Sequence, residues 1–297
     1  MDRELFIQPS VRIRNLEKKL LTKSQFERLY EADDLQDSIR HLNETVYSED
    51  LAKIDRAENF EVALSNSLNK TYNEVLALCP VKELVDILTY RFAFHNIKVA
   101  VKEKILQEDF EHIYSKVHYE DLDNLRKQFE TEKGEKGTWY EDTVIQAYKT
   151  FEETKDPEKI EFFIDKRYFE KVLEISKKLE LDLVEEYFRA MIDFVNIRTF
   201  IRCKRQGQDI SVLKEALIQG GYIDIDDISS YFYKEIQDLV DAYKNSKIGK
   251  SLFLGLKGYN ETGRLLLFEK YMENYLTNLL KERVKRMPYG PEIIFAY

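Results

Sequence analysis

The sequence predicts an all-α protein, and three observations support that prediction. Glycine occurs only 10 times and proline 5 times in 297 residues, and this scarcity of turn-forming residues disfavours sheet-rich folds. Hydrophobic residues make up 43% and charged residues 34% of the chain, as expected for amphipathic helices with solvated outer faces. Apolar residues also recur at helical spacing over long stretches. We therefore expect more than roughly 65% helix, about twice the average for globular proteins.

Four long helices are predicted from the apolar spacing, over 81–106, 158–180, 182–205 and 262–287. Pro80 and Pro157 mark the starts of the first two, since proline is tolerated in the first turn of a helix. Near the N-terminus, the apolar and basic segment 11–16 is followed by a cationic turn, and a new helix is predicted from about Thr22.

Short polar or glycine-rich segments are predicted to separate the helices. Lys133–Gly137 is expected to form a flexible junction, and Gly220-Gly221 to end a helix and turn the chain. Four glycines between 247 and 263 predict an irregular connection. Pro288, Gly290 and Pro291 are expected to stop the last long helix.

Two sets of residues recur at a spacing of about 100 residues. Apolar–acidic pairs occur three times, each 104 residues from the last, as Phe60-Glu61, Ile164-Asp165 and Phe268-Glu269. The tripeptide Asn96-Ile97-Lys98 returns 100 residues later as Asn196-Ile197-Arg198. Basic residues follow both tripeptides, and then an aspartate, Asp109 or Asp209, is expected to open the next helix.

These recurrences predict a chain built from helical repeats. We place a first repeat at 55–153, a second at 154–261 and the start of a third at 262–297. Residues 1–54 resemble the second half of a repeat, so we expect them to close a ring with the last one.

Composition and charge exclude several classes of protein. The net charge is −9, which disfavours a nucleic-acid-binding protein, because phosphate binding requires a basic surface. The first 20 residues contain no apolar signal segment. The sequence also has no run of 18 uncharged apolar residues, which a membrane-spanning helix would require. Cys79 and Cys203 are most simply read as reduced, buried thiols in a cytosolic protein.

The sequence predicts no catalytic, cofactor-binding or metal site. Gly249-Lys250-Ser251 imitates part of a phosphate-binding loop, but Lys244 stands where that loop requires glycine. The four histidines are not set at metal-ligand spacing. No serine or cysteine lies in the Gly-x-Ser-x-Gly context of a hydrolase nucleophile.

The combined order of these motifs resembles a known family. Arg12-Ile13-Arg14, the repeated Asn-Ile-(Lys/Arg) tripeptides and Gly290-Pro291-Glu292 leading to Phe295-Ala296-Tyr297 are similar to the C subunit of prokaryotic V/A-type rotary ATPases. The same family supplies the d subunit of the eukaryotic vacuolar enzyme. The resemblance spans the whole chain, although each motif alone is weak.

The resemblance implies three related helical bundles with pseudo-threefold symmetry that form a funnel. The family pattern continues past the last tyrosine into a helix with a further Asn-Leu/Ile-Arg motif, so the third repeat is expected to be truncated here. The resemblance also implies a non-enzymatic central-stalk subunit on the cytoplasmic face of the membrane. Such a subunit receives the central shaft and rests on the rotor ring, without nucleic acid, cofactor or insertion into the membrane.

Six residues are candidates for partner contact or for contacts between helices, namely Arg12, Arg14, Asn96, Lys98, Asn196 and Arg198. They could cap the carbonyls of neighbouring helices within each bundle. Alternatively, three cationic clusters could line the mouth of the funnel and meet acidic or polar shaft residues. Both roles stay open from the sequence.

Two other classes of protein compete with the rotor subunit. An unrelated helical scaffold or adaptor would share the composition. The repeats of an α-solenoid scaffold are usually about 34–47 residues long, whereas the residues that recur here are 100 or 104 residues apart. A helical hydrolase with scattered carboxylates would leave no recognisable spacing of acid and base. Co-purification with shaft and ring subunits would separate these alternatives.

Overall fold

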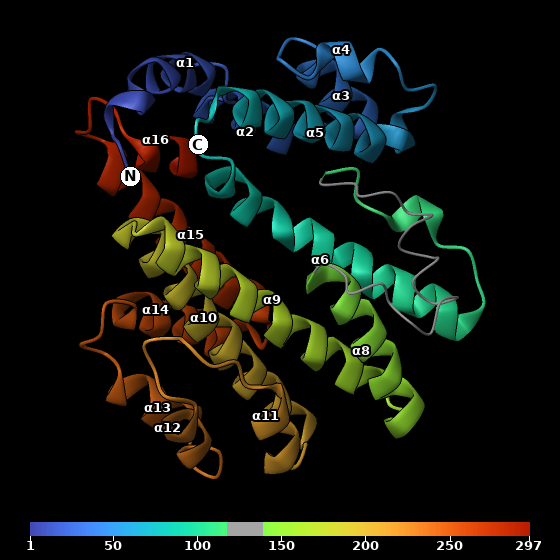
Figure 1. Cartoon of the computed structure of the whole chain (residues 1–297), viewed down its shortest axis with the longest axis vertical. Helices are drawn as coiled ribbons and strands as arrows, with labels where there is room; N and C mark the ends of the chain where they lie inside the picture. Colours follow the sequence, from blue (N-terminus) through green and yellow to red (C-terminus); the bar gives the residue numbers. More distant parts are fainter. Residues whose placement is uncertain (118–138) are drawn as a thin grey trace. The chain divides into compact units, whose positions relative to one another are not determined.

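A computed structural model describes residues 1–117 and 139–297, and it confirms the all-α prediction (Figure 1). Helices account for 75% of these residues, and none of them lies in a strand. The predicted junction at 133–137 lies outside the described residues. The chain folds into two compact units, which we describe separately.

Unit 1 comprises Met1–Lys127 with Met287–Phe295 and Tyr297. Its described helices are α1 (Ile7–Glu17), α2 (Lys23–Tyr30), α3 (Leu35–Leu42), α4 (Ser48–Leu51), α5 (Phe60–Leu78), α6 (Glu83–Leu106) and most of α16 (Pro291–Ala296), with short 3-10 turns at Glu4–Phe6, Ala57–Asn59 and Glu111–Ile113. The predicted start near Thr22 is confirmed, because Thr22 and Gln25 form a capping box at the beginning of α2.

Unit 2 comprises Gln128–Arg286 with Ala296. Its described helices are α8 (Trp139–Thr154), α9 (Pro157–Leu179), α10 (Asp182–Gln206), α11 (Ile210–Ala216), α12 (Ile225–Ser230), α13 (Ile236–Ala242), α14 (Gly249–Thr262) and α15 (Leu265–Val284). The Asp156 carboxylate accepts the Glu158 N–H at 2.9 Å, so α9 begins at Pro157 as predicted.

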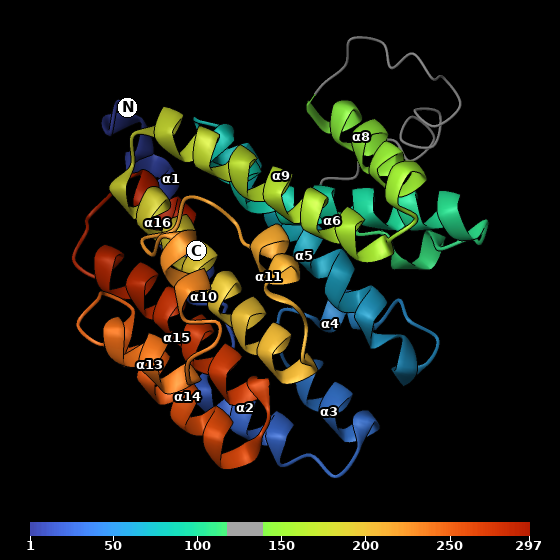
Figure 2. The same ribbon diagram turned by 90° about the horizontal axis from the view of Figure 1, so that it is seen from below.

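The core of unit 2 lies where α15 packs against α10 and α14 (Figure 2). Phe200 of α10, Leu256 of α14 and Phe268 of α15 are all fully or almost fully buried there. Across the α10–α15 contact, Phe194 and Tyr275 meet edge to face with ring centroids 5.5 Å apart. Burial of these large side chains is the main stabilising contribution in this unit.

The prediction of an irregular connection over 247–263 was wrong. Helix α14 occupies most of it, because Gly255 and Gly258 serve the packing against α15 rather than turns. A Cβ atom at Gly255 would lie only 2.9 Å from the Phe268 ring, and one at Gly258 would lie 2.8 Å from Leu267 Cβ. The absence of side chains therefore lets the two helices approach closely.

Candidate functional site

The two repeated asparagines are buried, and each clasps one residue of the segment that follows its helix. In unit 1, Asn96 Nδ2 donates to the Ser115 carbonyl at 3.1 Å, and the Ser115 N–H donates to Asn96 Oδ1 at 2.8 Å. In unit 2, Asn196 makes the same pair with Ile218, at 2.8 and 2.9 Å. The sequence suggested helix-end carbonyls as partners, whereas the structure gives a backbone pairing with a loop.

This clasp explains why asparagine stands at both positions. Its amide carries one acceptor and two donors on a short side chain, so it can satisfy both polar groups of a single peptide residue. Only one orientation of the amide fits the N–H and C=O of Ser115 or Ile218. Because the groups are buried or partly buried, leaving them unpaired would be costly, and the loop is thereby fixed to the helix.

The correspondence between the two copies continues beyond the asparagines. Helices α6 and α10 both end with a residue in the left-handed conformation, Gln107 (φ 55°) and Gly207 (φ 63°). Two residues later, Asp109 accepts the Glu111 N–H and Asp209 accepts the Ser211 N–H, both at 2.8 Å. The hydrogen bond from Ser211 also lowers the pKa of Asp209. The spacing of 100 residues thus marks two copies of one local structure.

The basic residues after the second asparagine meet an acidic residue of the predicted third repeat. Arg198 and Arg202, one turn apart on α10, each place a guanidinium nitrogen 3.5 Å from Glu269 Oε1 on α15. These side chains are partly exposed, so the contact is a modest one. The corresponding Lys98 is half-buried on α6.

The N-terminal candidates lie on α1. Arg12 is exposed, and Arg14 Nη1 donates to both carboxylate oxygens of Glu17 at 2.9 Å. The described hydrogen bonds and ion pairs thus connect Arg14, Asn96, Asn196 and Arg198 to neighbours within their own units. Arg12, Arg14, Asn96 and Lys98 belong to unit 1, whereas Asn196 and Arg198 belong to unit 2.

Sequence reasoning missed a contact between the two ends of the chain within unit 1. Arg3 donates from both terminal nitrogens to the two oxygens of Glu292, at 2.8 and 2.9 Å, and the Gly290 N–H donates to the buried Ser10 hydroxyl at 3.1 Å. The hydrogen bond to Glu292 raises the pKa of Arg3. Gly290 has φ 147°, and a Cβ there would collide with Arg3. The Gly-Pro-Glu motif was visible in the sequence, but its partner was not.

A second missed residue is the fully buried Asp193 on α10. Its two oxygens accept the backbone N–H groups of Tyr222 and Ile223, at 3.1 and 3.0 Å, directly after the Gly220-Gly221 turn. Burial raises the pKa of Asp193 to about 6, which outweighs the opposing effect of the two N–H groups. The sequence did contain a signal for this residue, since Asp193 is an acidic residue in the apolar stretch of a predicted helix, one turn before Asn196.

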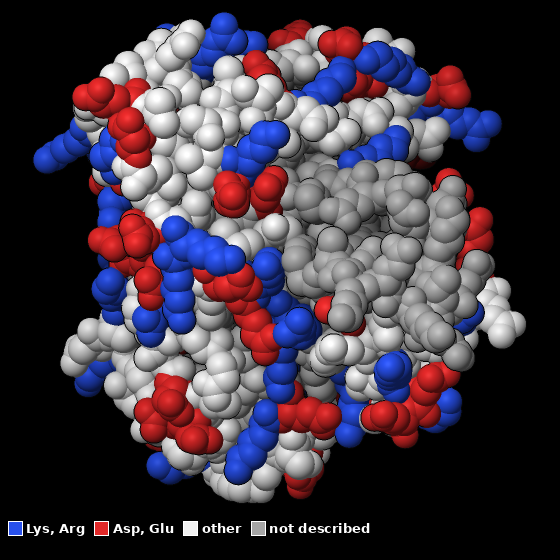
Figure 3. Space-filling view, viewed as in Figure 1, with Lys and Arg blue, Asp and Glu red and all other residues white. Residues whose placement is uncertain are grey.

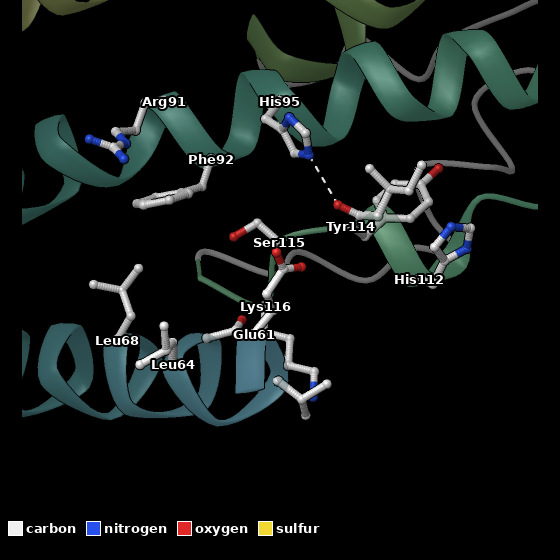
Figure 4. A pocket seen from close by; sticks show the side chains of 13 residues that line it. Glu61, Leu64, Leu68, Arg91, Phe92, His95, His112, Tyr114, Ser115 and Lys116 are labelled. Atoms are coloured by element: carbon white, nitrogen blue, oxygen red, sulfur yellow. Dashed lines mark hydrogen bonds between the residues drawn. The ribbon is translucent and has the colours of Figure 1, made fainter. Parts of the chain in front are cut away.

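A third feature is a groove of about 630 Å³ in unit 1 between α5, α6 and segment 111–117 (Figure 4). Leu64 and Leu68 point into it from α5, and Phe92 faces them from α6. His95 of α6 is hydrogen-bonded across to the carbonyl of Ile113. The groove has an apolar floor and polar edges, which is the usual make-up of a binding cleft.

No set of three or more His, Cys, Asp or Glu side chains that could hold a metal ion occurs in the described ranges. None of the helices in those ranges is long and apolar enough to cross a membrane. On the face shown in Figure 3, acidic and basic side chains are interspersed over the described parts.

The fold and the clasps define the class of protein, which is all-helical with two long helices, α6 and α10, fixed to their return loops by buried asparagines. The sequence matches the ATP synthase (C/AC39) subunit family over residues 9–297, and the chain belongs to that family. It is 26% identical to the C subunit of the A-type ATP synthase of Pyrococcus horikoshii, over 97% of this chain and 80% of that protein. It is 23% identical to the C subunit of the V-type sodium ATPase of Enterococcus hirae, over 98% and 87%.

Proposed function

We propose that this chain is a non-catalytic central-stalk (rotor) subunit of a V/A-type ATPase. It links the central shaft to the membrane rotor ring and transmits torque for ATP-coupled transport of protons or sodium ions. The observation that carries the proposal is the family match over residues 9–297, together with relatives named as C subunits of A-type ATP synthases and of a V-type sodium ATPase.

The internal contacts are compatible with a mechanical role. A part that transmits torque must resist deformation, and each asparagine clasp ties a long helix to its return loop with two hydrogen bonds. Arg3 and Glu292 tie the two ends of the chain together in unit 1. These contacts oppose sliding of one element along another, because buried or charge-assisted hydrogen bonds are costly to break.

The proposal specifies partners and location. The partners are the central shaft subunits and the proteolipid ring, without nucleic acid and without insertion of this chain into the bilayer. The chain lies on the cytoplasmic face as a peripheral part of the complex. We also keep the pseudo-threefold funnel, with repeats at 55–153, 154–261 and 262–297 closed by residues 1–54, as part of this proposal.

Affinity purification of the tagged full chain from its own cells tests the proposal. Shaft and ring subunits should co-purify, and calorimetry with ATP should detect neither hydrolysis nor micromolar binding by the isolated chain. A scaffold unrelated to rotary ATPases would recover neither set of subunits. ATP turnover by the isolated chain would instead favour the hydrolase alternative.

A further inference from the structure

Two contacts join the elements that surround the groove between α5 and α6. One turn along α5 from Leu68, Tyr72 meets Phe92 of α6 edge to face, with ring centroids 5.7 Å apart. Lys116 Nζ of segment 111–117 donates to Asn66 Oδ1 of α5 at 3.2 Å. These two contacts join α5 to α6 and to segment 111–117 beside the groove.

The third wall, segment 111–117, is fixed to α6 by several hydrogen bonds. Asn96 clasps Ser115, and the Tyr114 hydroxyl donates to Glu103 Oε2 at 2.7 Å. His95 Nε2 lies 3.0 Å from the Ile113 carbonyl oxygen. Because a carbonyl oxygen only accepts, Nε2 must carry the hydrogen. A wall held in this way needs little ordering when a ligand binds, which favours affinity.

The lining combines an apolar floor with a mainly basic edge (Figure 4). Leu64, Phe92 and the partly exposed Leu68 form the centre of the floor, with Val62 and Ile113 beside them. Among the described lining residues, Arg91 and Lys116 supply two cations at the edge and Glu61 supplies one carboxylate. The Arg91 guanidinium lies 4.6 Å from the centre of the Phe92 ring, so charge and apolar surface adjoin.

This combination selects one kind of occupant. An apolar floor between two helices suits the apolar face of a third helix, and the basic edge favours Asp and Glu beside that face. We propose that the groove receives an amphipathic helix of the central shaft that carries acidic residues along its apolar stripe. The inference rests on the proposed function, and it places the contact with the shaft at these residues of unit 1.

The test measures the affinity of the full chain for purified shaft subunits and, separately, for the detergent-solubilised rotor ring of its own ATPase. Leu68→Asp places a charge on the floor, and Arg91→Glu reverses the edge charge. The matched controls are Leu266→Asp on α15 and Lys257→Glu on α14, which change exposed side chains of unit 2. Melting temperatures of all four variants should stay near that of the wild type, since each altered side chain is exposed.

We expect each groove variant to weaken shaft binding by at least about tenfold, whereas the controls stay within about twofold. Added salt should weaken shaft binding of the wild type more steeply than that of Arg91→Glu. Unchanged shaft affinity in both groove variants, or a loss confined to the ring, overturns the assignment of the groove. Failure of the wild type to bind either shaft or ring refutes the proposed function itself.

Discussion

The helix pairs α5–α6 and α9–α10 occupy corresponding places in the predicted repeats, but they are packed very differently. In its 19 residues, α5 buries only Ala63 and Val75. The corresponding helix α9 buries a full apolar stripe, namely Ile160, Ile164, Phe169, Val172, Ile175 and Leu179, together with the hydroxyl-bearing Ser176. Both second helices, α6 and α10, are extensively buried and carry the asparagine clasp. The difference therefore lies in the first helix of each pair.

This contrast indicates how one local structure can serve two purposes. The clasp and the capping aspartate hold the second helix and its loop in the same way in both copies. The apolar face of the first helix is then free to vary without loss of that framework. In unit 2 it completes a core, and in unit 1 it leaves an apolar groove beside α6.

The largest expected effect compares the first helices directly. Ile164→Ala in α9 removes a fully buried side chain and should lower the free energy of unfolding by about 3 kcal/mol, through lost burial and a cavity. Leu68→Ala in α5 removes a side chain that is 41% exposed, and should cost less than about 1 kcal/mol. Urea unfolding of both variants measures the difference. Equal losses would show that α5 is as tightly packed as α9.

The second prediction concerns the two clasps. Asn196→Ala should cost about 2 kcal/mol, because it leaves the N–H and C=O of Ile218 buried without partners. Asn96→Ala should cost about half as much, since Ser115 is only partly buried and water can replace the amide. Asn274→Ala, at an exposed position of α15, is the control. A larger loss for Asn96 would reverse our ranking of the two clasps.

The helices were predictable because their signal is local, whereas the contacts that fix them are not. Apolar spacing and Pro157 gave α9 nearly to its ends. The glycines of α14 led to the wrong prediction of an irregular connection. In the sequence alone, a glycine in a turn cannot be told from one that packs against Phe268 of a facing helix. Asn96 and Asn196 were recognisable from their recurrence, but not their partners 19 and 22 residues onward. The pair of Arg3 and Glu292, 289 residues apart, left no local sign.

The third prediction uses a difference between the copies, since Asp193 in α10 corresponds to Ala93 in α6. The folded state holds the pKa of Asp193 at about 6, above the usual 3.8. A raised pKa stabilises the fold fully below pH 3.8, and this contribution is lost as the pH rises through 6. Between about pH 5 and about pH 7.5 the wild type should therefore lose about 1.4 kcal/mol relative to Asp193→Asn. Urea unfolding of the wild type and of Asp193→Asn at these two pH values measures this loss. An equal change of the free energy of unfolding in both proteins would contradict a buried titrating carboxyl.

The smallest expected effect concerns the basic residues that follow each clasp. Arg198 approaches Glu269 at 3.5 Å, with 37% of its side chain and 31% of the Glu269 side chain exposed. Such a pair contributes little, and Glu269 keeps Arg202 at the same distance when Arg198 is lost. Arg198→Ala should therefore lower the free energy of unfolding by less than about 0.5 kcal/mol.

Because the expected loss of stability is so small, Arg198→Ala can report on binding with little interference from folding. Under the groove assignment, shaft affinity should not change in Arg198→Ala, since the altered side chain lies in unit 2, whereas Arg91→Glu weakens it. Reassembly of the isolated chain with shaft and ring subunits, followed by a melting curve of each variant, makes the comparison. A marked loss of reassembly in Arg198→Ala at unchanged melting temperature would instead identify the cationic residue after the Asn196 clasp as a partner contact. The same substitution at Lys98 would then show whether both copies of the motif share that role.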